Sequence, residues 1–389
     1  MGTLVNADFL AEFPPSSYAD WLVALRDSLV GADPASLVAH SPEGISIPPL
    51  PHPDTYLIPD LSGGAQGGSG RVSASPLQPV RWAQGGWQIA QEINLDEPRT
   101  FNRALLETLA NGQTAVVLAA SPRLHSSADL EVALAGVDLA QYPIYAADAR
   151  VLDWLRATRS VEDMANLRGC IGSPSADYAA LAERFALAAT VAPGLGCVNI
   201  STARQHNNGA KAVQELAFVL AAGADILRGL LRRGLAIDAI APRLHVTLCI
   251  GEDFFMQIAK LRAVKSLWAQ MTSAFGASES AQRLHLHARS GTRNKSREDA
   301  HNNLLRHTCA ALAAALAGVD SLTLAAFDAP AEDEFSRRLS RNIQLILQHE
   351  LQLTRYIDPA GGSWHVEYLT DELGRRAWAA FQQIEGERD

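Results

Sequence analysis

Short apolar runs alternate with longer amphipathic stretches along most of the chain from about residue 85 onward. This alternation is typical of repeated β/α units, in which each buried strand leads into a helix that covers the sheet. Eight such units favour an α/β fold of the closed (β/α)8 TIM barrel type over an open doubly wound sheet. The predicted strands cover residues 87–93, 114–120, 143–147, 169–172, 197–201, 244–250, 284–289 and 321–327.

Helical periodicity fills the segments between these runs, most clearly over residues 210–233, 254–275, 302–317, 334–351 and 370–384. Acidic residues 332–334 lead into the fourth pattern, where carboxylates suit the positive amino end of a helix better than they suit acid/base catalysis. In the second pattern, apolar residues with helical spacing define one buried face. Three basic residues of that pattern lie on its other faces: Lys260, Arg262 and Lys265. We expect the two lysines to be solvated.

The first part of the chain has a different character. Prolines and serines at residues 14–17 precede a helical pattern through Trp21, Leu25 and Leu29. Residues 45–56 are rich in proline, and residues 62–70 are almost entirely glycine and serine. We predict an N-terminal helical and extended arm over 1–60, a Gly/Ser/Pro-rich linker over 61–84 and the barrel over 85–389. A phosphate-binding glycine loop is a weaker alternative for 62–70, because no predicted strand leads directly into it.

Composition excludes several classes of function. The net charge is −9 and no basic stripe alternates with aromatic residues, which argues against a nucleic-acid partner. The amino terminus lacks a basic segment followed by a long apolar one, and no later run reaches about 18 apolar residues. We therefore expect a cytoplasmic protein without a membrane partner. The four cysteines have no metal-ligand spacing and are expected to be reduced and mostly buried.

Polar residues at the carboxyl ends of the predicted strands should face the mouth of the barrel, where barrel enzymes bind ligands. Those positions hold Ser201, Glu252, Ser290 and Asp328. His285 and His287 alternate along one strand and so share a face, but no third ligand accompanies them, and we predict no metal site. No Gly-x-Ser-x-Gly motif supports a hydrolase triad.

Several segments resemble, in order, the methylmalonyl-CoA mutase family. They are DFFMQIAKLRAVKSLW at 253–268, Gly209-Ala210 with QELA at 214–217, residues 223–228, RNIQLILQ at 341–348 and DPAGGSWHVE at 358–367. The N-terminal pattern at residues 13–21 and 43–45 is similar to the small, or β, subunit of two-chain bacterial mutases. In that family this segment is an arm that embraces the other subunit.

The resemblance implies a definite chemistry for the family. Its members interconvert methylmalonyl-CoA and succinyl-CoA, or related acyl-CoA isomers, by a radical rearrangement that uses adenosylcobalamin, with the cofactor carrying the radical chemistry. The catalytic subunit binds CoA through the axis of a (β/α)8 barrel. Cobalamin lies between the barrel mouth and a carboxyl-terminal flavodoxin-like domain.

This chain departs from that pattern at the positions that meet substrate and cofactor. It has no Asp-x-His-x-x-Gly motif, so we expect no cobalamin-binding flavodoxin-like domain, and the loop at 94–102 lacks the family's tyrosine. Arg204 stands where the family has a histidine that polarises the thioester carbonyl, with His206 two residues on. Arg289 replaces a glutamine beside the retained His287. Two positions that hold the adenosyl ribose in the family's catalytic subunits are occupied here by alanine, Ala325 and Ala329.

These departures predict a non-catalytic β-type subunit of a heterodimeric adenosylcobalamin-dependent methylmalonyl-CoA mutase, whose partner is the catalytic large subunit. The isomerase activity would belong to the complex. We expect no catalytic residue, no bound cofactor and no metal in this chain. One alternative is a catalytic acyl-CoA mutase barrel that works with a separate cobalamin-binding chain, and another is a barrel that binds CoA or another anion without chemistry. The candidate barrel-mouth residues are Arg204, His206, His287 and Arg289.

Overall fold

The computed structural model describes residues 16–52, 86–118, 123–329 and 333–387. The predicted linker at 61–84 lies outside these residues. The described chain is a mixed α/β structure in which parallel strands form two sheets. The five-stranded sheet has the order β3 (Gln88–Ile89), β11 (Ser321–Thr323), β10 (His285–Ser290), β9 (Leu244–Ile250) and β8 (Val198–Ser201). The four-stranded sheet has the order β4 (Val116–Leu118), β5 (Ile144–Ala146), β6 (Gly169–Ile171) and β7 (Leu195–Gly196).

Each of the eight predicted strand segments overlaps an observed strand, and β7 is the additional strand of the two parallel sheets. Every residue of β9 is buried, as expected for a strand of a parallel sheet that is covered on both faces. In β10 the exposure alternates, with His285, His287 and Arg289 on one face and fully buried residues on the other. The prediction that the two histidines share a face is therefore confirmed.

The two sheets are hydrogen-bonded to each other at both edges. At one edge, the amide of Thr114 donates to the carbonyl of Ile89 at 3.1 Å. At the other edge, Cys197 alone separates β7 from β8, and the amide of Asn199 donates to the carbonyl of Gly172 at 3.1 Å. Main-chain hydrogen bonds thus connect the edge of each sheet to the neighbouring edge of the other.

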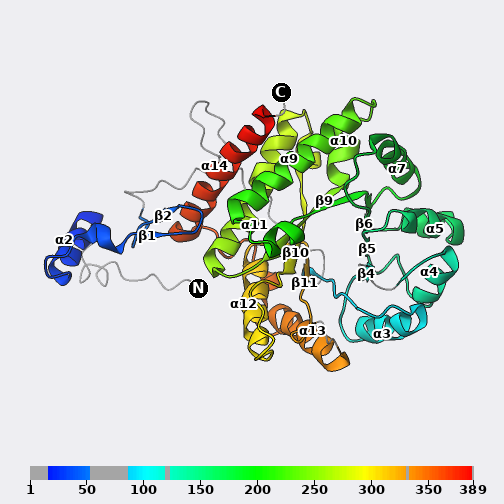
Figure 1. Ribbon diagram of the computed structural model, residues 1–389, viewed down its shortest axis with the longest axis horizontal. Helices are drawn as coiled ribbons and strands as arrows, with labels where there is room; N and C mark the ends of the chain where they lie inside the picture. The colour runs from blue at the N-terminus through cyan, green and yellow to red at the C-terminus, as the bar shows by residue number, and fades with distance from the viewer. Residues whose placement is uncertain (1–15, 53–85, 119–122, 330–332, 388–389) are drawn as a thin grey trace, which may run out of the picture.

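Helices follow most strands and lie outside the sheets (Figure 1). Those beside the four-stranded sheet are α3 (Pro98–Ala110), α4 (Ser127–Ala133), α5 (Arg150–Thr158), α6 (Val161–Ala165) and α7 (Tyr178–Val191). The later ones are α8 (Ala203–Asn207), α9 (Ala212–Leu231), α10 (Ile237–Ile240), α11 (Phe254–Ala274), α12 (Asn302–Leu316), α13 (Glu334–His349) and α14 (Trp364–Gly386). All five predicted long helices are present, although α14 begins six residues earlier than predicted. No described helix combines the length and apolarity needed to span a bilayer.

The prediction that acidic residues suit the amino end of α13 is confirmed for Asp333, and a close contact joins two of the other helices. Asp333 precedes α13 and accepts a hydrogen bond from the amide of Ser336 at 2.7 Å, which caps the positive end of the helix. Trp268 is 0% exposed and packs against Gly223 of α9. A Cβ atom at Gly223 would lie 2.7 Å from the indole, so glycine is what allows the two helices to approach.

The expectation that the lysines of α11 are solvated is wrong. Lys260 and Arg262 are each 1% exposed, and Lys265 is partly buried. Each cation has acceptors that arrive from other elements. Lys260 meets Glu215, Arg262 meets Asp358 and Glu367, and Lys265 donates to the carbonyls of Ala317 and Gly318 at the carboxyl end of α12. Burial nevertheless lowers the pKa of Lys265 to about 8.

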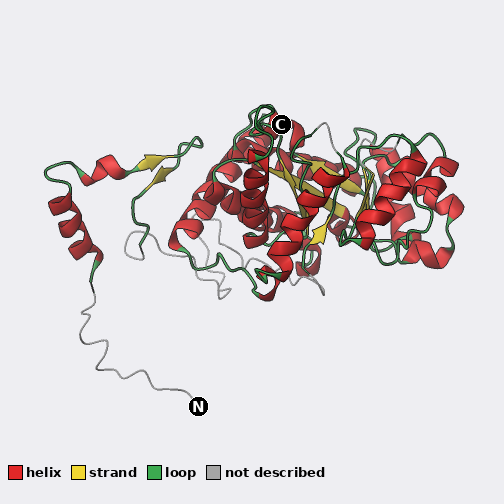
Figure 2. Ribbon diagram, turned by 90° about the horizontal axis from the view of Figure 1, so that it is seen from below, coloured by secondary structure: helices red, strands yellow, loops and turns green. Residues whose placement is uncertain are grey.

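The N-terminal arm consists of α2 (Tyr18–Ser28), a 3-10 turn (Pro34–Leu37) and the antiparallel pair β1 (Ala39–His40) and β2 (Ser46–Ile47). It extends away from the sheets in both views (Figures 1 and 2). No residue of α2 is buried. The hairpin is attached to the body, because Ile45 is 0% exposed within the main core and Tyr368 of α14 donates to the carbonyl of Ser46 at 2.6 Å.

Candidate functional site

A cavity of about 320 Å³ lies between the two sheets, toward the carboxyl ends of their strands. This is a size that suits a small ligand. Six of the polar residues in its wall come from four strands and the segment after β3: Glu92, Asn199, Thr247, His287, Arg289 and Thr323. His287 and Arg289, two of the four candidate residues, therefore lie together at this site.

The polar side chains of this cavity bind one another. Arg289 Nη1 lies 2.6 Å from Glu92 Oε1, so the guanidinium and the carboxylate neutralise each other. Thr247 Oγ1 donates to Asn199 Oδ1 at 2.9 Å, and the hydroxyl of Thr323 donates to the carbonyl of Ala90. A ligand entering the cavity would have to compete with these internal hydrogen bonds.

Four ring side chains occupy the space between the sheets next to the cavity: Tyr145, His245, His285 and His287. The imidazoles of His245 and His285 stack with centroids 4.1 Å apart. The phenol ring of Tyr145 lies 6.0 to 6.5 Å from all three imidazoles. Because Tyr145 is on β5 and the histidines are on β9 and β10, this ring cluster bridges the two sheets.

Hydrogen bonds fix the ring cluster in place. Tyr145 OH donates to Gln88 Oε1 at 2.6 Å and lies 3.1 Å from His285 Nε2, while His287 Nδ1 lies 2.8 Å from Ser321 Oγ. Burial lowers the pKa of His245, His285 and His287, and that of His287 falls to about 3. The three imidazoles are therefore neutral near pH 7 and bring no positive charge to the cavity.

His206, the third candidate residue, belongs to a separate buried network. Its Nδ1 lies 2.9 Å from Glu215 Oε1, and Glu215 also accepts from Thr202 Oγ1 at 2.6 Å and from Lys260 Nζ at 3.0 Å. Burial by itself would raise the pKa of Glu215, but the charges and hydrogen bonds of Lys260, His206 and Thr202 outweigh it and leave that pKa below its usual value. The imidazole packs closely against Gly251 and Gly291 and does not line the cavity.

Arg204, the fourth candidate, is exposed on α8 and also lies outside the cavity wall. Of the polar positions predicted at the mouth, Ser201 lines the cavity, whereas Glu252 lines a different groove. Ser290 instead accepts a hydrogen bond from the amide of Ala325 at 3.0 Å. The sequence reasoning thus placed two candidate residues and one serine at the cavity.

Sequence reasoning missed several residues of the site, including Glu92, Tyr145, Asn199, His245 and Thr247. All five lie within predicted strands, and the usable signal is the alternation of His245 and Thr247 along one of them. Within the described ranges no group of three or more His, Cys, Asp or Glu side chains could hold a metal ion. Three of the four cysteines are buried, as predicted, and Cys309 is exposed.

Comparison with known proteins gives a consistent result. A family model described as methylmalonyl-CoA mutase matches residues 161–387. The chain is 37% identical over 322 residues to "Methylmalonyl-CoA mutase small subunit" of Streptomyces virginiae, covering 77% of this chain and 52% of that protein. It is 39% identical over 203 residues to the small subunit of Porphyromonas gingivalis, covering 51% and 33%.

Relatives named as large subunits match as well. The chain is 30% identical over 438 aligned positions to "Probable methylmalonyl-CoA mutase large subunit" of Mycobacterium tuberculosis, covering 98% of this chain and 58% of that protein. Across these three relatives the chain spans 33% to 58% of their length.

Proposed function

The chain belongs to the methylmalonyl-CoA mutase family, and we propose that it is a non-catalytic, β-type subunit of an adenosylcobalamin-dependent methylmalonyl-CoA mutase. In this role it stabilises a catalytic large subunit, and the isomerisation of methylmalonyl-CoA and succinyl-CoA takes place in that partner. The chain contributes architecture and contact surface to a heterodimer. It supplies no residue to the reacting centre and does not hold adenosylcobalamin.

The observation that carries this proposal is the ring cluster. In the family, CoA reaches the catalytic centre along the axis of the barrel. Here Tyr145, His245 and His285 occupy the space between the sheets, with His245 and His285 stacked at 4.1 Å and Tyr145 hydrogen-bonded to Gln88. A pantetheine chain along that axis would have to displace tightly packed, hydrogen-bonded rings, at the cost of their packing and of buried polar groups left without partners.

The remaining polar groups support the same reading. Arg289 is paired with Glu92, so its charge is not available to a substrate carboxylate or thioester oxygen without breaking that pair. His206 is engaged by Glu215, and Arg204 is exposed outside the cavity. The four candidate residues therefore do not converge on one position at which a reacting atom would sit.

For the architecture, we infer that the two sheets form one closed (β/α)8 barrel over residues 85–389. The hydrogen bonds from Thr114 to Ile89 and from Asn199 to Gly172, which join the sheets at both edges, support closure. Residues 1–60 are proposed as the arm. Its helix α2 has no buried residue and leaves Val23 56% exposed, which suits an element that is covered only when a partner binds.

The role can be tested by reconstitution. The chain is purified alone and with a candidate large subunit, and isomerisation is assayed with added adenosylcobalamin. We expect turnover only with the large subunit present. The double variant Arg289→Gln/Glu92→Gln, which removes the pair without leaving one charge behind, and His287→Gln should change the turnover of the complex by less than about twofold.

The principal alternative makes the opposite prediction for the same variants. If the chain is a catalytic barrel that works with a separate cobalamin-binding chain, it turns over with only that chain added, and the substitutions at Arg289 and His287 abolish activity. Either result would refute the proposed role. Calorimetric titration with CoA and methylmalonyl-CoA completes the test, because binding to the isolated chain would indicate an open axis.

A further inference from the structure

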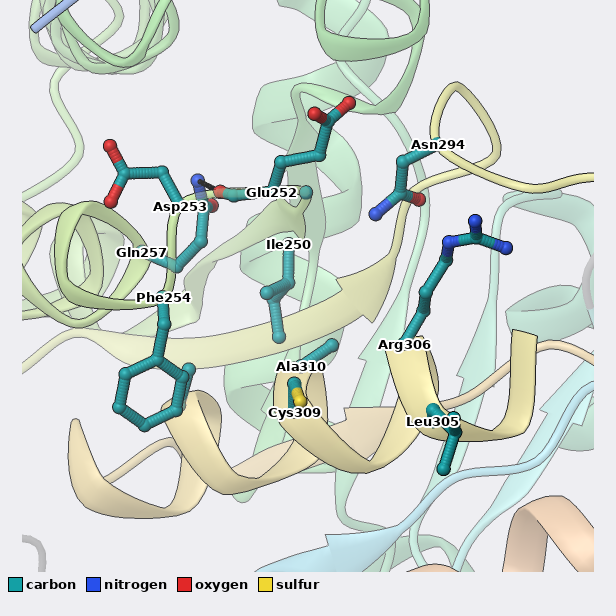
Figure 3. A pocket seen from close by; sticks show the side chains of 12 residues that line it. Ile250, Glu252, Asp253, Phe254, Gln257, Asn294, Leu305, Arg306, Cys309 and Ala310 are labelled. Carbon is teal, nitrogen blue, oxygen red and sulfur yellow. Dashed lines mark hydrogen bonds between the residues drawn. The ribbon is translucent and has the colours of Figure 1, made fainter. Parts of the chain in front are cut away.

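A second hollow of about 440 Å³ lies between the amino end of α11 and the middle of α12, and it is lined by neither the ring cluster nor the candidate residues (Figure 3). Ile250, Ala310 and Ala313 give it an apolar floor. Glu252 and Asn294 stand at its upper rim, and Arg306 lies along one side (Figure 3). We call this hollow the α11–α12 groove. Its volume is in the range typical of small-molecule sites.

The groove contains the one exposed thiol of the four cysteines, Cys309. In Figure 3, Cys309 lies on α12, below Ile250 in this view. The other three thiols are buried, and burial raises the pKa of Cys249 to about 11, of Cys197 to about 12 and of Cys170 well above its usual value. Since the thiolate is the reacting form, thiol chemistry on the folded chain is directed to Cys309.

Two amide oxygens in the wall of the groove have no hydrogen-bond partner among the residues that the structure describes. Gln257 is 7% exposed, and its Nε2 donates to the carbonyl of Glu252 at 2.8 Å, which leaves Oε1 unsatisfied. Asn294 Oδ1 is also buried and unsatisfied. A buried acceptor without a donor is costly, so both oxygens call for N–H or O–H groups from a ligand.

The side of the groove offers the complementary group. Arg306 Nη1 donates to Asn303 Oδ1 at 2.8 Å, and the rest of its guanidinium borders the hollow. An arginine at such a position favours a carboxylate. A matching ligand therefore has amide N–H groups for Gln257 and Asn294, a carboxylate for Arg306 and a sulfur that reaches Cys309.

We propose that the α11–α12 groove is a modification site, at which Cys309 exchanges with the disulfide of a small peptide thiol of the glutathione class. The Cys309 thiol loses its proton to solvent, and the thiolate attacks one sulfur of the disulfide. The old S–S bond breaks as the new one forms. Cys309 is oxidised to a mixed disulfide, and the other half of the reagent leaves as a thiolate that takes up a proton.

The proposal is tested with two disulfide reagents, only one of which has the amide and carboxylate groups that the groove would bind. The full chain is treated with oxidised glutathione or with bis(2-hydroxyethyl) disulfide, which lacks amides and carboxylates. The rate of adduct formation is followed by intact mass, and the site is mapped by peptide digestion. Each rate is divided by that of an unstructured peptide containing Cys309, which removes the intrinsic reactivity of the reagent.

We expect a single adduct at Cys309 and a normalised rate that is larger for oxidised glutathione. Asn294→Leu and Gln257→Leu should each lower the glutathione rate by about five- to tenfold, the effect of losing one buried hydrogen bond, and leave the other rate unchanged. Gln383→Leu, on the exposed face of α14, is the matched control and should alter neither rate.

Three outcomes would overturn the proposal. They are equal normalised rates for the two disulfides, a glutathione rate that is unchanged in both groove variants, and an adduct that forms at one of the buried thiols before Cys309. Because Asn294 lies on a loop and is partly exposed, its variant remains informative even if Gln257→Leu fails to fold.

Discussion

Lys260 Nζ lies 3.0 Å from Glu215 Oε1, and each of the two side chains is 1% exposed. The pair joins α11 to α9, and Lys260 also donates to the carbonyl of Cys249 at 2.7 Å. Both side chains have been removed from water, so their mutual contact and their additional hydrogen bonds offset the cost of burying them. The relationship explains why a helix with three basic residues can be buried on nearly all sides.

Replacing Lys260 by methionine should destabilise the chain by about 3–5 kcal/mol, because it leaves Glu215 as a buried carboxylate without its cation. The free energy of unfolding in urea measures this. The double variant Lys260→Met/Glu215→Gln should recover at least half of the loss. Arg123→Met is the matched control, since Arg123 and its partner Asp96 are 71% and 54% exposed and such a pair contributes about 1 kcal/mol or less. Equal losses in the two single variants would contradict the prediction.

The ring cluster predicts a specific dependence of stability on pH. His287 has a folded-state pKa of about 3, below its ordinary value of 6.5, so the unfolded chain binds more protons. Stability is therefore complete above about pH 6.5 and is lost as the pH falls toward 3. At about pH 5 the contribution of His287 should be smaller by about 1–2 kcal/mol than at about pH 7. Urea denaturation of His287→Gln should show a shallower pH dependence, and an unchanged slope would contradict the assignment.

The sequence predicted the strands well and the burial of charges poorly, for one physical reason. The burial of an apolar run such as residues 244–250 can be predicted from the run itself, because a parallel strand is covered on both faces. A buried cation requires a partner, and the partners of Lys260 and Arg262 lie 45 and 105 residues away in sequence. No local pattern contains that information, so solvation is the natural expectation for Lys260.

In the candidate site, too, local sequence patterns predict some of the residues and cannot predict others. Strand alternation placed His285 and His287 on one face, and the structure confirms it. Tyr145 completes the cluster from a strand 140 residues earlier than His285, and nothing near Tyr145 in sequence indicates that contact. Arg204 and His206 are candidates because they align with a family motif. The alignment fixes their order along the chain but not whether a side chain turns toward the cavity or toward Glu215.

The contact of Gly223 with Trp268 predicts that alanine will be unfavourable where helix propensity favours it. In an exposed helix, glycine to alanine stabilises by about 0.5–1 kcal/mol. At residue 223 the new Cβ would lie 2.7 Å from the indole, and overpacking of this kind costs about 1–3 kcal/mol. Gly386→Ala, where no atom of the described part of the chain lies within 4 Å, is the matched control and should be neutral or slightly stabilising. Thermal unfolding of both variants decides the question, and shifts of the same sign would contradict it.

The attachment of the N-terminal arm predicts the last result. Ile45 is 0% exposed and anchors the hairpin, whereas Val23 of α2 is 56% exposed. Ile45→Ala should weaken docking of the hairpin by about 2 kcal/mol or more, which corresponds to about thirtyfold faster amide exchange. The amide of Ser41, which donates to the carbonyl of Ile45 at 2.9 Å, reports this directly. Val23→Ala should leave that exchange unchanged but weaken binding of the proposed large subunit. Faster exchange of the buried β9 amides in Ile45→Ala would show instead that the whole fold, and not the arm alone, depends on this side chain.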